Sequence, residues 1–175
     1  MKRIQINTLC LVASLIFFVG IKHVSAQSVK LYDDDANPYE QLEKAKQEAM
    51  IGNKHVLIQI GGNWCKWCVK FHGFYTNDKE LDSIMQANYV IINVAYEQKK
   101  NQDFFASLGY PQRFGFPVFV VTDADGNRLH TQNSWYLEDG VSSYDKEKLK
   151  AFINDWTVQA INPYSEKRKN NGKPE

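Results

Sequence analysis

The sequence predicts a mixed α/β domain in which a central sheet is covered by helices on both faces. Three apolar runs, at residues 56–60, 89–95 and 118–121, have the nearly continuous hydrophobic pattern of buried strands. Segments with apolar residues at helical spacing separate these runs. The chain has 175 residues, which is enough for one domain with a substantial core.

The first half of the domain is expected to begin with a helix. Asn37 is a typical N-cap, Pro38 suits the first helical position, and Gly52 is expected to end this helix. Gly61 and its neighbours Gly62 and Asn63 then break an apolar strand. The elements predicted after the first helix are a strand at 55–60 and helices at 65–75 and 78–87.

The second half is predicted to continue the alternation of strands and helices. A turn at 123–127, of sequence Asp-Ala-Asp-Gly-Asn, indicates a hairpin, and residues 133–144 are predicted to form an irregular insertion. The closing helix is indicated by apolar residues on one face. The predicted elements are a strand at 89–95, a helix at 98–108, strands at 118–121 and 128–131, and a helix at 145–160.

The N-terminus has the pattern of a secretory signal peptide. Lys2 and Arg3 precede an apolar run at 9–21, which is shorter than the about 20 residues that span a bilayer. Small residues at 24–26 predict cleavage before Gln27, and an uncleaved membrane anchor is the alternative. The predicted organisation is a signal peptide at 1–26, a flexible lead at 27–36, the domain at 37–161 and a disordered tail at 162–175.

The charge balance argues against nucleic-acid binding. The chain has 21 basic and 20 acidic residues, and no stretch forms a polybasic arm. Of the three cysteines, Cys10 lies inside the signal peptide, and its position within the apolar run does not fit lipid attachment. Cys65 and Cys68 remain, and a disulfide scaffold would need several spaced pairs. The sequence therefore predicts that Cys65 and Cys68 have a chemical role and not a structural one.

The position of the Cys-x-x-Cys motif fits thiol–disulfide exchange. The motif lies between a predicted strand and a predicted helix, whose N-terminus stabilises a thiolate through free N–H groups. A second sulfur, separated from the first by two intervening residues, can attack a mixed disulfide. Cys65, at the start of the helix, is the predicted nucleophile, and Cys68 is the predicted resolving cysteine.

The chain from about residue 38 to 160 resembles the thioredoxin superfamily. The resemblance lies in the strand that precedes Trp64-Cys65-x-x-Cys68, in Gly115-Phe116-Pro117 before an apolar strand, and in the terminal hairpin and helix. It implies a thioredoxin-like α/β fold with a central mixed sheet, an extra N-terminal helix and a cis-proline at Pro117. With its export signal, the chain is similar to exported relatives of protein disulfide isomerases and periplasmic reductases.

This resemblance implies a thiol–disulfide oxidoreductase in the periplasm or another extracytoplasmic compartment. Its partners would be exported proteins with thiols or disulfides, and a membrane thiol-redox donor or acceptor. It would need no cofactor beyond the redox-active Cys65–Cys68 disulfide. The residues expected to bind substrate are Trp64, Lys66, Trp67, Phe116 and Pro117.

Two features depart from typical thioredoxins. The dipeptide between the cysteines is Lys66-Trp67 instead of Gly-Pro; Trp67 either faces substrate or merely covers the motif. Gln59 occupies the position of a buried acid that assists proton transfer at the resolving cysteine. Glu97 is a candidate substitute, with a solvated loop acid as the alternative. His72 is expected to be an ordinary surface histidine.

A Cys-x-x-Cys motif and a thioredoxin-like fold also occur in proteins with three other functions. A structural zinc site needs four ligands, and two cysteines with scattered histidines do not supply them. Covalent haem attachment needs a histidine directly after the motif, where Val69 stands. The remaining alternative is a non-catalytic binding module that holds partner segments in the cis-proline groove. The sequence leaves open the direction of electron flow, the substrate, the oligomeric state and the role of the 133–144 insertion.

Overall fold

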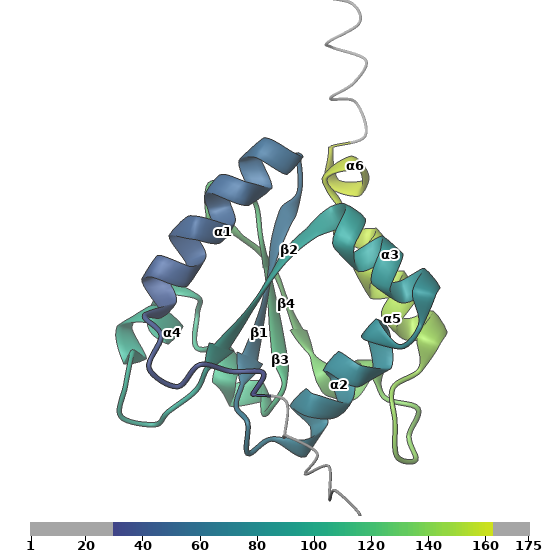
Figure 1. Ribbon diagram of the computed structural model, residues 1–175, viewed down its shortest axis with the longest axis horizontal. Coiled ribbons are helices and arrows are strands. Elements are labelled where there is room, and N and C mark those ends of the chain that lie inside the picture. Colours follow the sequence, from purple (N-terminus) through teal and green to yellow (C-terminus); the bar gives the residue numbers. More distant parts are fainter. Residues whose placement is uncertain (1–29, 163–175) are drawn as a thin grey trace, which may run out of the picture.

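A four-stranded mixed sheet forms the centre of the protein (Figure 1). The computed structural model describes residues 30–162, so the predicted signal peptide, residues 27–29 and residues 163–175 of the predicted tail lie outside the described part. The strand order is β2-β1-β3-β4, with β1 parallel to β2 and antiparallel to β3. The strands are β1 (His55–Gly61), β2 (Tyr89–Ala95), β3 (Val118–Thr122) and β4 (Arg128–Asn133).

One face of the sheet is covered by α1 (Pro38–Gly52) and α4 (Gln102–Ser107), on the left of Figure 1. Asn37 caps α1 by accepting a hydrogen bond from the Tyr39 N–H at 3.0 Å, and Asn53 closes the helix in the left-handed conformation. Alternate strand residues face these helices because side chains alternate across a strand. The buried members of this core are Ala45, Ala49, Val56, Ile58, Ile60, Val94, Phe104, Phe105, Leu108, Val118 and Val120.

The opposite face is covered by α2 (Lys66–Thr76), α3 (Lys79–Asn88) and α5 (Lys146–Asp155), on the right of Figure 1. Phe71 of α2 is fully buried, and its ring centroid lies 4.4 Å from that of Phe119 in β3. This contact fixes α2, the helix that begins at the cysteine motif, against the central strands. The predicted fold class, a thioredoxin-like mixed sheet preceded by an extra helix, is confirmed.

Several element boundaries differ from the sequence predictions. Helix α4 is shorter than the predicted 98–108. The predicted closing helix is broken after Asp155, and a short α6 (Val158–Ile161) follows. The break is explained by Thr157, whose hydroxyl accepts a hydrogen bond from the Ala160 N–H at 3.1 Å and so caps a new helix. No helix within residues 30–162 is long and apolar enough to cross a membrane.

The described part of the predicted flexible lead is attached to the domain. Tyr32 is fully buried, and Asp33 forms a parallel bridge with Val94 of β2. Residues 27–36 are predicted to form a flexible lead because they are polar and acidic. In the structure, residues 31–33 instead pack along the edge of the sheet. This arrangement is favourable because burying the large aromatic side chain of Tyr32 lowers the free energy of the folded protein.

The hydroxyl of Tyr89 ties the start of β2 to helix α5. It donates a hydrogen bond to the Ile153 carbonyl at 2.6 Å, and Tyr89 is nearly completely buried. Replacing Tyr89 with phenylalanine leaves a buried carbonyl without a partner, so we expect the free energy of unfolding to fall by about 1–2 kcal/mol. Urea denaturation measures this change. The matched control, Tyr136→Phe at a residue that is 69% exposed, should change it by less than about 0.5 kcal/mol.

Candidate active site

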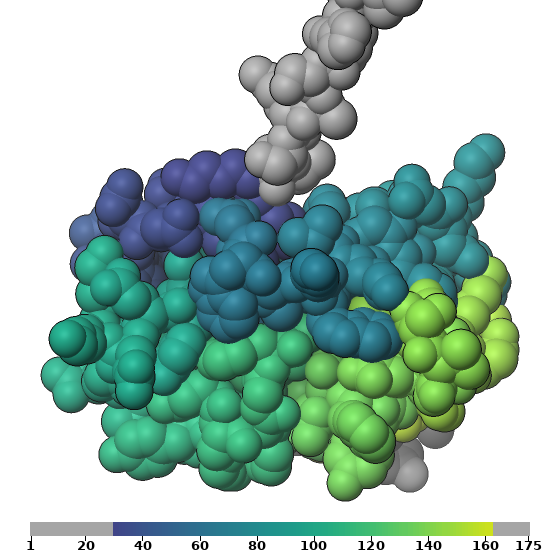
Figure 2. All heavy atoms as spheres, turned by 90° about the horizontal axis from the view of Figure 1, so that it is seen from below, coloured from purple at the N-terminus to yellow at the C-terminus, as the bar shows by residue number. Residues whose placement is uncertain are grey.

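The cysteine motif lies where β1 ends and α2 begins, at the lower end of the molecule in Figure 1. Cys65 is the N-cap of α2, and its sulfur accepts a hydrogen bond from the Cys68 N–H at 3.1 Å. The free N–H groups at a helix N-terminus stabilise negative charge, so this position favours a Cys65 thiolate. In the space-filling view from this end, the blue segment that contains the motif lies at the surface in the middle of the face, above the green and yellow-green segments that follow later in the chain (Figure 2).

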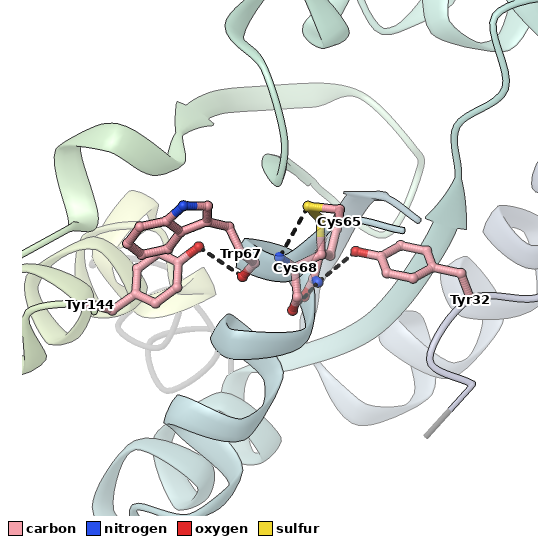
Figure 3. The surroundings of a disulfide bond; sticks show 6 residues. Tyr32, Cys65, Trp67, Cys68 and Tyr144 are labelled. Carbon is pink, nitrogen blue, oxygen red and sulfur yellow. Dashed lines mark hydrogen bonds between the residues drawn. A yellow bond between two sulfur atoms is a disulfide. The ribbon is translucent and has the colours of Figure 1, made fainter. Parts of the chain in front are cut away.

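The two cysteines are joined by a disulfide bond (Figure 3). Cys65 keeps 6% of its surface exposed, whereas Cys68 has none. An external sulfur can therefore approach Cys65 but not Cys68. This asymmetry fits the predicted roles, with Cys65 as the attacking cysteine and Cys68 as the resolving one.

The Phe116–Pro117 peptide bond is cis and lies beside the motif. Pro117 is buried, and Phe116 packs against the cluster formed by Tyr32, Cys65 and Cys68. The ring of Trp64, which is 61% exposed, meets the Phe116 ring edge-on with centroids 5.3 Å apart. The structure thus brings Trp64, Phe116 and Pro117 together around Cys65, and their role in binding substrate stays a prediction.

The two residues between the cysteines differ in their surroundings. Lys66 is exposed, whereas Trp67 is half-buried and its ring meets that of Tyr144 edge-on at 5.4 Å. The Tyr144 hydroxyl donates a hydrogen bond to the Trp67 carbonyl at 3.1 Å, and the Lys70 ammonium lies 4.7 Å from the indole centroid. These contacts favour the interpretation that Trp67 covers the motif.

The predicted insertion supplies the partner of Trp67 and also reaches solvent. Tyr144 is buried against Phe71 and Trp67, so the end of the insertion packs on the active-site helix. Trp135 and Tyr136, in a short 3₁₀ turn that directly follows β4, are both largely exposed. The insertion therefore has one packed end and one aromatic surface.

Gln59 is buried in the middle of β1, where the family carries its acid. Its amide nitrogen donates to the Tyr32 hydroxyl at 2.6 Å and to the Cys68 carbonyl at 3.3 Å. Glu97, the candidate substitute, is exposed and its carboxylate pairs with Lys100 at 2.9 Å, as expected of a solvated loop acid.

His72 is half-buried in α2. Its Nδ1 lies 3.2 Å from the Tyr75 hydroxyl. Burial lowers the pKa of His72, because the protonated ring is less well solvated there.

Three residues that the sequence analysis did not assign to the site lie in contact with it. Tyr32 packs against both cysteines, and the Asn63 side chain holds the Tyr32 main chain. Gly61 lies under the Cys68 sulfur, with no room for a side chain. The only sequence signal for Tyr32 is an aromatic residue in an otherwise polar and acidic stretch, which does not by itself indicate a partner 27 positions away.

The described residues also bear on metal chemistry. Between residues 30 and 162, the structure has no group of three or more His, Cys, Asp or Glu side chains placed to hold a metal ion. The two cysteine sulfurs are bonded to each other.

Comparison with known proteins agrees with this geometry. The chain is 29% identical over 100 residues to the disulfide bond reductase DsbH of Chlamydia pneumoniae; the match covers 51% of this chain and 56% of the relative, so it spans about half of that protein. Its fold is similar to that of a disulphide isomerase from Xylella fastidiosa, with a TM-score of 0.61 and 20% identity over 71% of this chain and 94% of that one. A thioredoxin from Thermus thermophilus is also similar, with a TM-score of 0.50 and 15% identity over 69% and 86% of the two chains. A thioredoxin-like family model matches residues 37–124, which is half of the chain, and the protein therefore belongs to the thioredoxin-like family.

Proposed function

We propose that this protein is an exported thiol–disulfide oxidoreductase that exchanges disulfides with cysteines of other exported proteins. The observation that carries the proposal is the asymmetric cysteine pair. Cys65 caps α2 and keeps part of its surface open beside the cis peptide bond at Pro117, and Cys68 is enclosed. Such a pair can form a mixed disulfide with a partner and then release it.

The reductive reaction would proceed in two balanced steps. The Cys65 thiolate attacks one sulfur of a substrate disulfide, and the other substrate sulfur leaves as a thiolate. The Cys68 thiolate then attacks the Cys65 sulfur, which breaks the bond to the substrate and forms the Cys65–Cys68 disulfide. An external dithiol must return two electrons to the pair before another cycle.

Substrate would bind over the aromatic residues around Cys65. Trp64 and Phe116 present ring surfaces beside the sulfur, and the Phe116–Pro117 segment leads into β3. Lys66 would add positive charge at the rim, where an exposed charge contributes little to affinity. The location outside the cytoplasm rests on the signal-peptide pattern of residues 1–26. The partner that exchanges electrons with the pair would be a membrane thiol-redox protein.

Catalysis can be tested with a peptide disulfide as substrate and a dithiol as electron donor. We expect substrate thiols to appear over many turnovers per protein molecule. Retained binding of partner segments without any turnover would contradict the proposal and favour the non-catalytic binding module.

The reduction potential of the Cys65–Cys68 pair gives the direction of the reaction. The protein is equilibrated with defined thiol–disulfide buffers and its free thiols are alkylated. A value near about −270 mV identifies a reductant that a membrane donor keeps reduced, and a value near about −120 mV identifies an oxidant. A pair that cannot be cycled at all would exclude redox function.

A further inference from the structure

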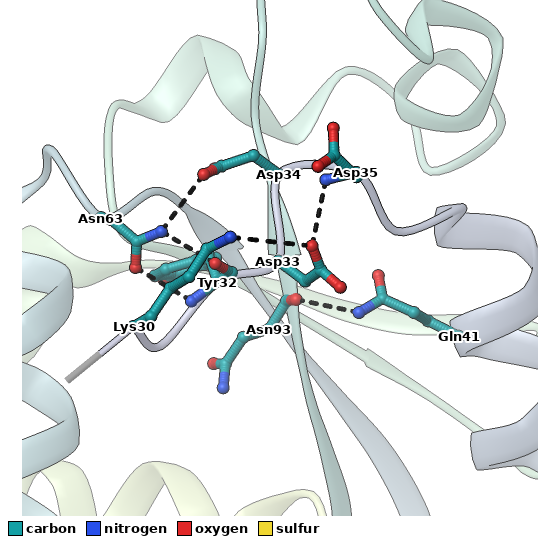
Figure 4. Close-up of polar contacts among 8 residues, drawn as sticks. All are labelled: Lys30, Tyr32, Asp33, Asp34, Asp35, Gln41, Asn63 and Asn93. Carbon is teal, nitrogen blue, oxygen red and sulfur yellow. Dashed lines mark hydrogen bonds and ion pairs between the residues drawn. The ribbon is translucent and has the colours of Figure 1, made fainter.

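Tyr32 reaches the cysteine pair from a segment that precedes the first helix of the domain. The side-chain amide of Asn63 accepts a hydrogen bond from the Tyr32 N–H at 3.0 Å and donates one to the Tyr32 carbonyl at 2.8 Å (Figure 4). The next residue, Asp33, bridges to Val94 of β2. Two separate attachments therefore hold Tyr32 beside the loop that leads into Cys65.

The Tyr32 hydroxyl and the Cys68 sulfur face the same small space over Gly61. A Cβ atom on Gly61 would stand 2.4 Å from the sulfur and 2.8 Å from the hydroxyl oxygen. Both side chains are fully buried and pack in one cluster with Cys65. In Figure 3 the phenol points at the motif from the side opposite to Trp67 and Tyr144. The hydroxyl is therefore close to the resolving sulfur.

The hydrogen bonds of Gln59 leave the Tyr32 proton free for another acceptor. The Gln59 Nε2 donates one hydrogen to the Cys68 carbonyl and the other to the Tyr32 hydroxyl oxygen. In this arrangement the amide nitrogen faces the Cys68 carbonyl, which can only accept, and the hydroxyl oxygen of Tyr32 is the acceptor toward Gln59. The O–H of Tyr32 is then available to the sulfur of Cys68.

The phenol of Tyr32 acts as a donor and not as a base. Burial raises the pKa of Tyr32 above its usual value, so the proton stays on the oxygen at neutral pH. Tyr75 and Tyr144 on the other side of the motif are also buried phenols with raised pKa values. The charged side chains of the segment that carries Tyr32, of α2 and of the loop after β2 are all exposed; those nearest the site are Lys30, Asp33, Asp34, Asp35, Lys66, Lys70 and Glu97. The other titratable groups nearby are Cys65 and the half-buried His72.

We propose that Tyr32 supplies the hydrogen bond that stabilises the Cys68 thiolate in the second step of exchange, with Gln59 and Asn63 as its positioning residues. The inference rests on the proposed function, since it concerns the step that releases substrate. A neutral phenol thus serves the resolving cysteine, and it is held by Gln59, which stands at the position of the carboxylate of a typical thioredoxin.

The step balances without a further reactant. The Cys68 thiol loses its proton to solvent, and the electron pair of its thiolate forms the bond to the Cys65 sulfur. The bond between Cys65 and the substrate sulfur breaks, and its electron pair leaves with the substrate as a thiolate. The Tyr32 proton remains on oxygen throughout, and its hydrogen bond to the sulfur is lost as the disulfide forms.

The test follows the reduced protein in stopped flow with dithionitrobenzoate, whose released thiolate is coloured. Attack by Cys65 releases a first equivalent, and attack by Cys68 on the mixed disulfide releases a second. In Tyr32→Phe we expect the first phase to be unchanged and the second to slow by about three- to tenfold at neutral pH. Loss of a charge-assisted hydrogen bond shifts the pH dependence of the second phase upward by about one unit or more. At high pH both Cys68 thiols are ionised, and a more basic thiolate is intrinsically more nucleophilic, so the variant should there be at least as fast as wild type.

Two further variants separate this effect from a loss of stability. Asn63 is exposed, and Asn63→Ala removes the two hydrogen bonds that hold the Tyr32 main chain. This variant should also slow the second phase. Tyr89→Phe removes a buried hydroxyl elsewhere and should leave both phases unchanged. A second phase with the same pH profile in wild type and Tyr32→Phe would overturn the role of Tyr32 while the proposed function stands. Absence of the first phase in the wild type would instead overturn the proposed function.

Discussion

Replacing Cys65 with serine is expected to reduce turnover of a disulfide substrate to the rate measured without protein. Cys65 is the cysteine with exposed surface, and its sulfur lies at the N-terminus of α2, where a thiolate is stabilised. A serine hydroxyl at this position is not ionised at neutral pH and does not attack a disulfide. Thiol release from a peptide disulfide, measured with excess dithiol donor, gives the comparison.

Cys68→Ser is the matched control, because it also removes the disulfide but keeps the exposed sulfur. We expect this variant to carry out the first step and then to accumulate a mixed disulfide with substrate, which mass spectrometry detects under non-reducing conditions. Both variants should be compared with reduced wild type, since neither can form the Cys65–Cys68 bond. Substantial turnover by Cys65→Ser would show that Cys65 is not the nucleophile.

Replacing Gly61 with alanine is expected to destabilise the protein and to displace the Cys68 side chain. The added Cβ would stand 2.4 Å from the Cys68 sulfur and 2.8 Å from the Tyr32 hydroxyl, closer than real Cβ atoms approach their neighbours. Both neighbours are fully buried, so neither can move into solvent. Overpacking of this kind costs about 1–3 kcal/mol, which urea unfolding of the oxidised protein measures.

Gly73→Ala is the matched control for the same substitution in the helix that carries the motif. Its Cβ would meet its nearest neighbour, the Asn77 amide nitrogen, at 3.7 Å, which is ordinary contact. Alanine in a helix interior is favoured over glycine by about 0.5–1 kcal/mol, so this variant should be more stable than wild type. An unchanged unfolding free energy in Gly61→Ala would mean that the space over Gly61 is wider than the structure indicates.

Local patterns in the sequence were sufficient to predict the strands of the sheet and to recognise the cysteine motif. The strands of residues 56–60, 89–95 and 118–121 are nearly continuous apolar runs, and such runs are visible in sequence. β1 and β3 are buried along their whole length, and β2, at the edge of the sheet, is partly buried. The motif is recognisable because thiol exchange requires two cysteines at the start of a helix. The cis peptide bond at Pro117, which the family resemblance implied, is present.

Local patterns did not predict the structure correctly or completely where a competing local hydrogen bond or a contact with a distant segment determines it. The closing helix reads as one continuous amphipathic segment, yet the Thr157 hydroxyl caps a second helix. From the sequence, Trp67 could either face substrate or cover the motif. The structure favours the second interpretation, because Tyr144, 77 residues later in the chain, packs against its ring. Contacts across such separations leave no periodic signal in the segments that make them.

The family, the fold class and the cysteine pair could all be predicted from local features of the chain, because they depend on hydrophobic periodicity, on cysteine spacing and on short motifs. The surroundings of the Cys68 sulfur, in contrast, depend on contacts between distant segments that form when the chain folds. In the sequence, Tyr32 belongs to a stretch that is predicted to be a polar lead. Gln59 is visible there only as a glutamine in place of the buried acid of typical thioredoxins. Folding places the two side chains in hydrogen-bond contact next to Cys68, because burial of the phenol and the clamp from Asn63 together fix a segment that has no regular structure of its own.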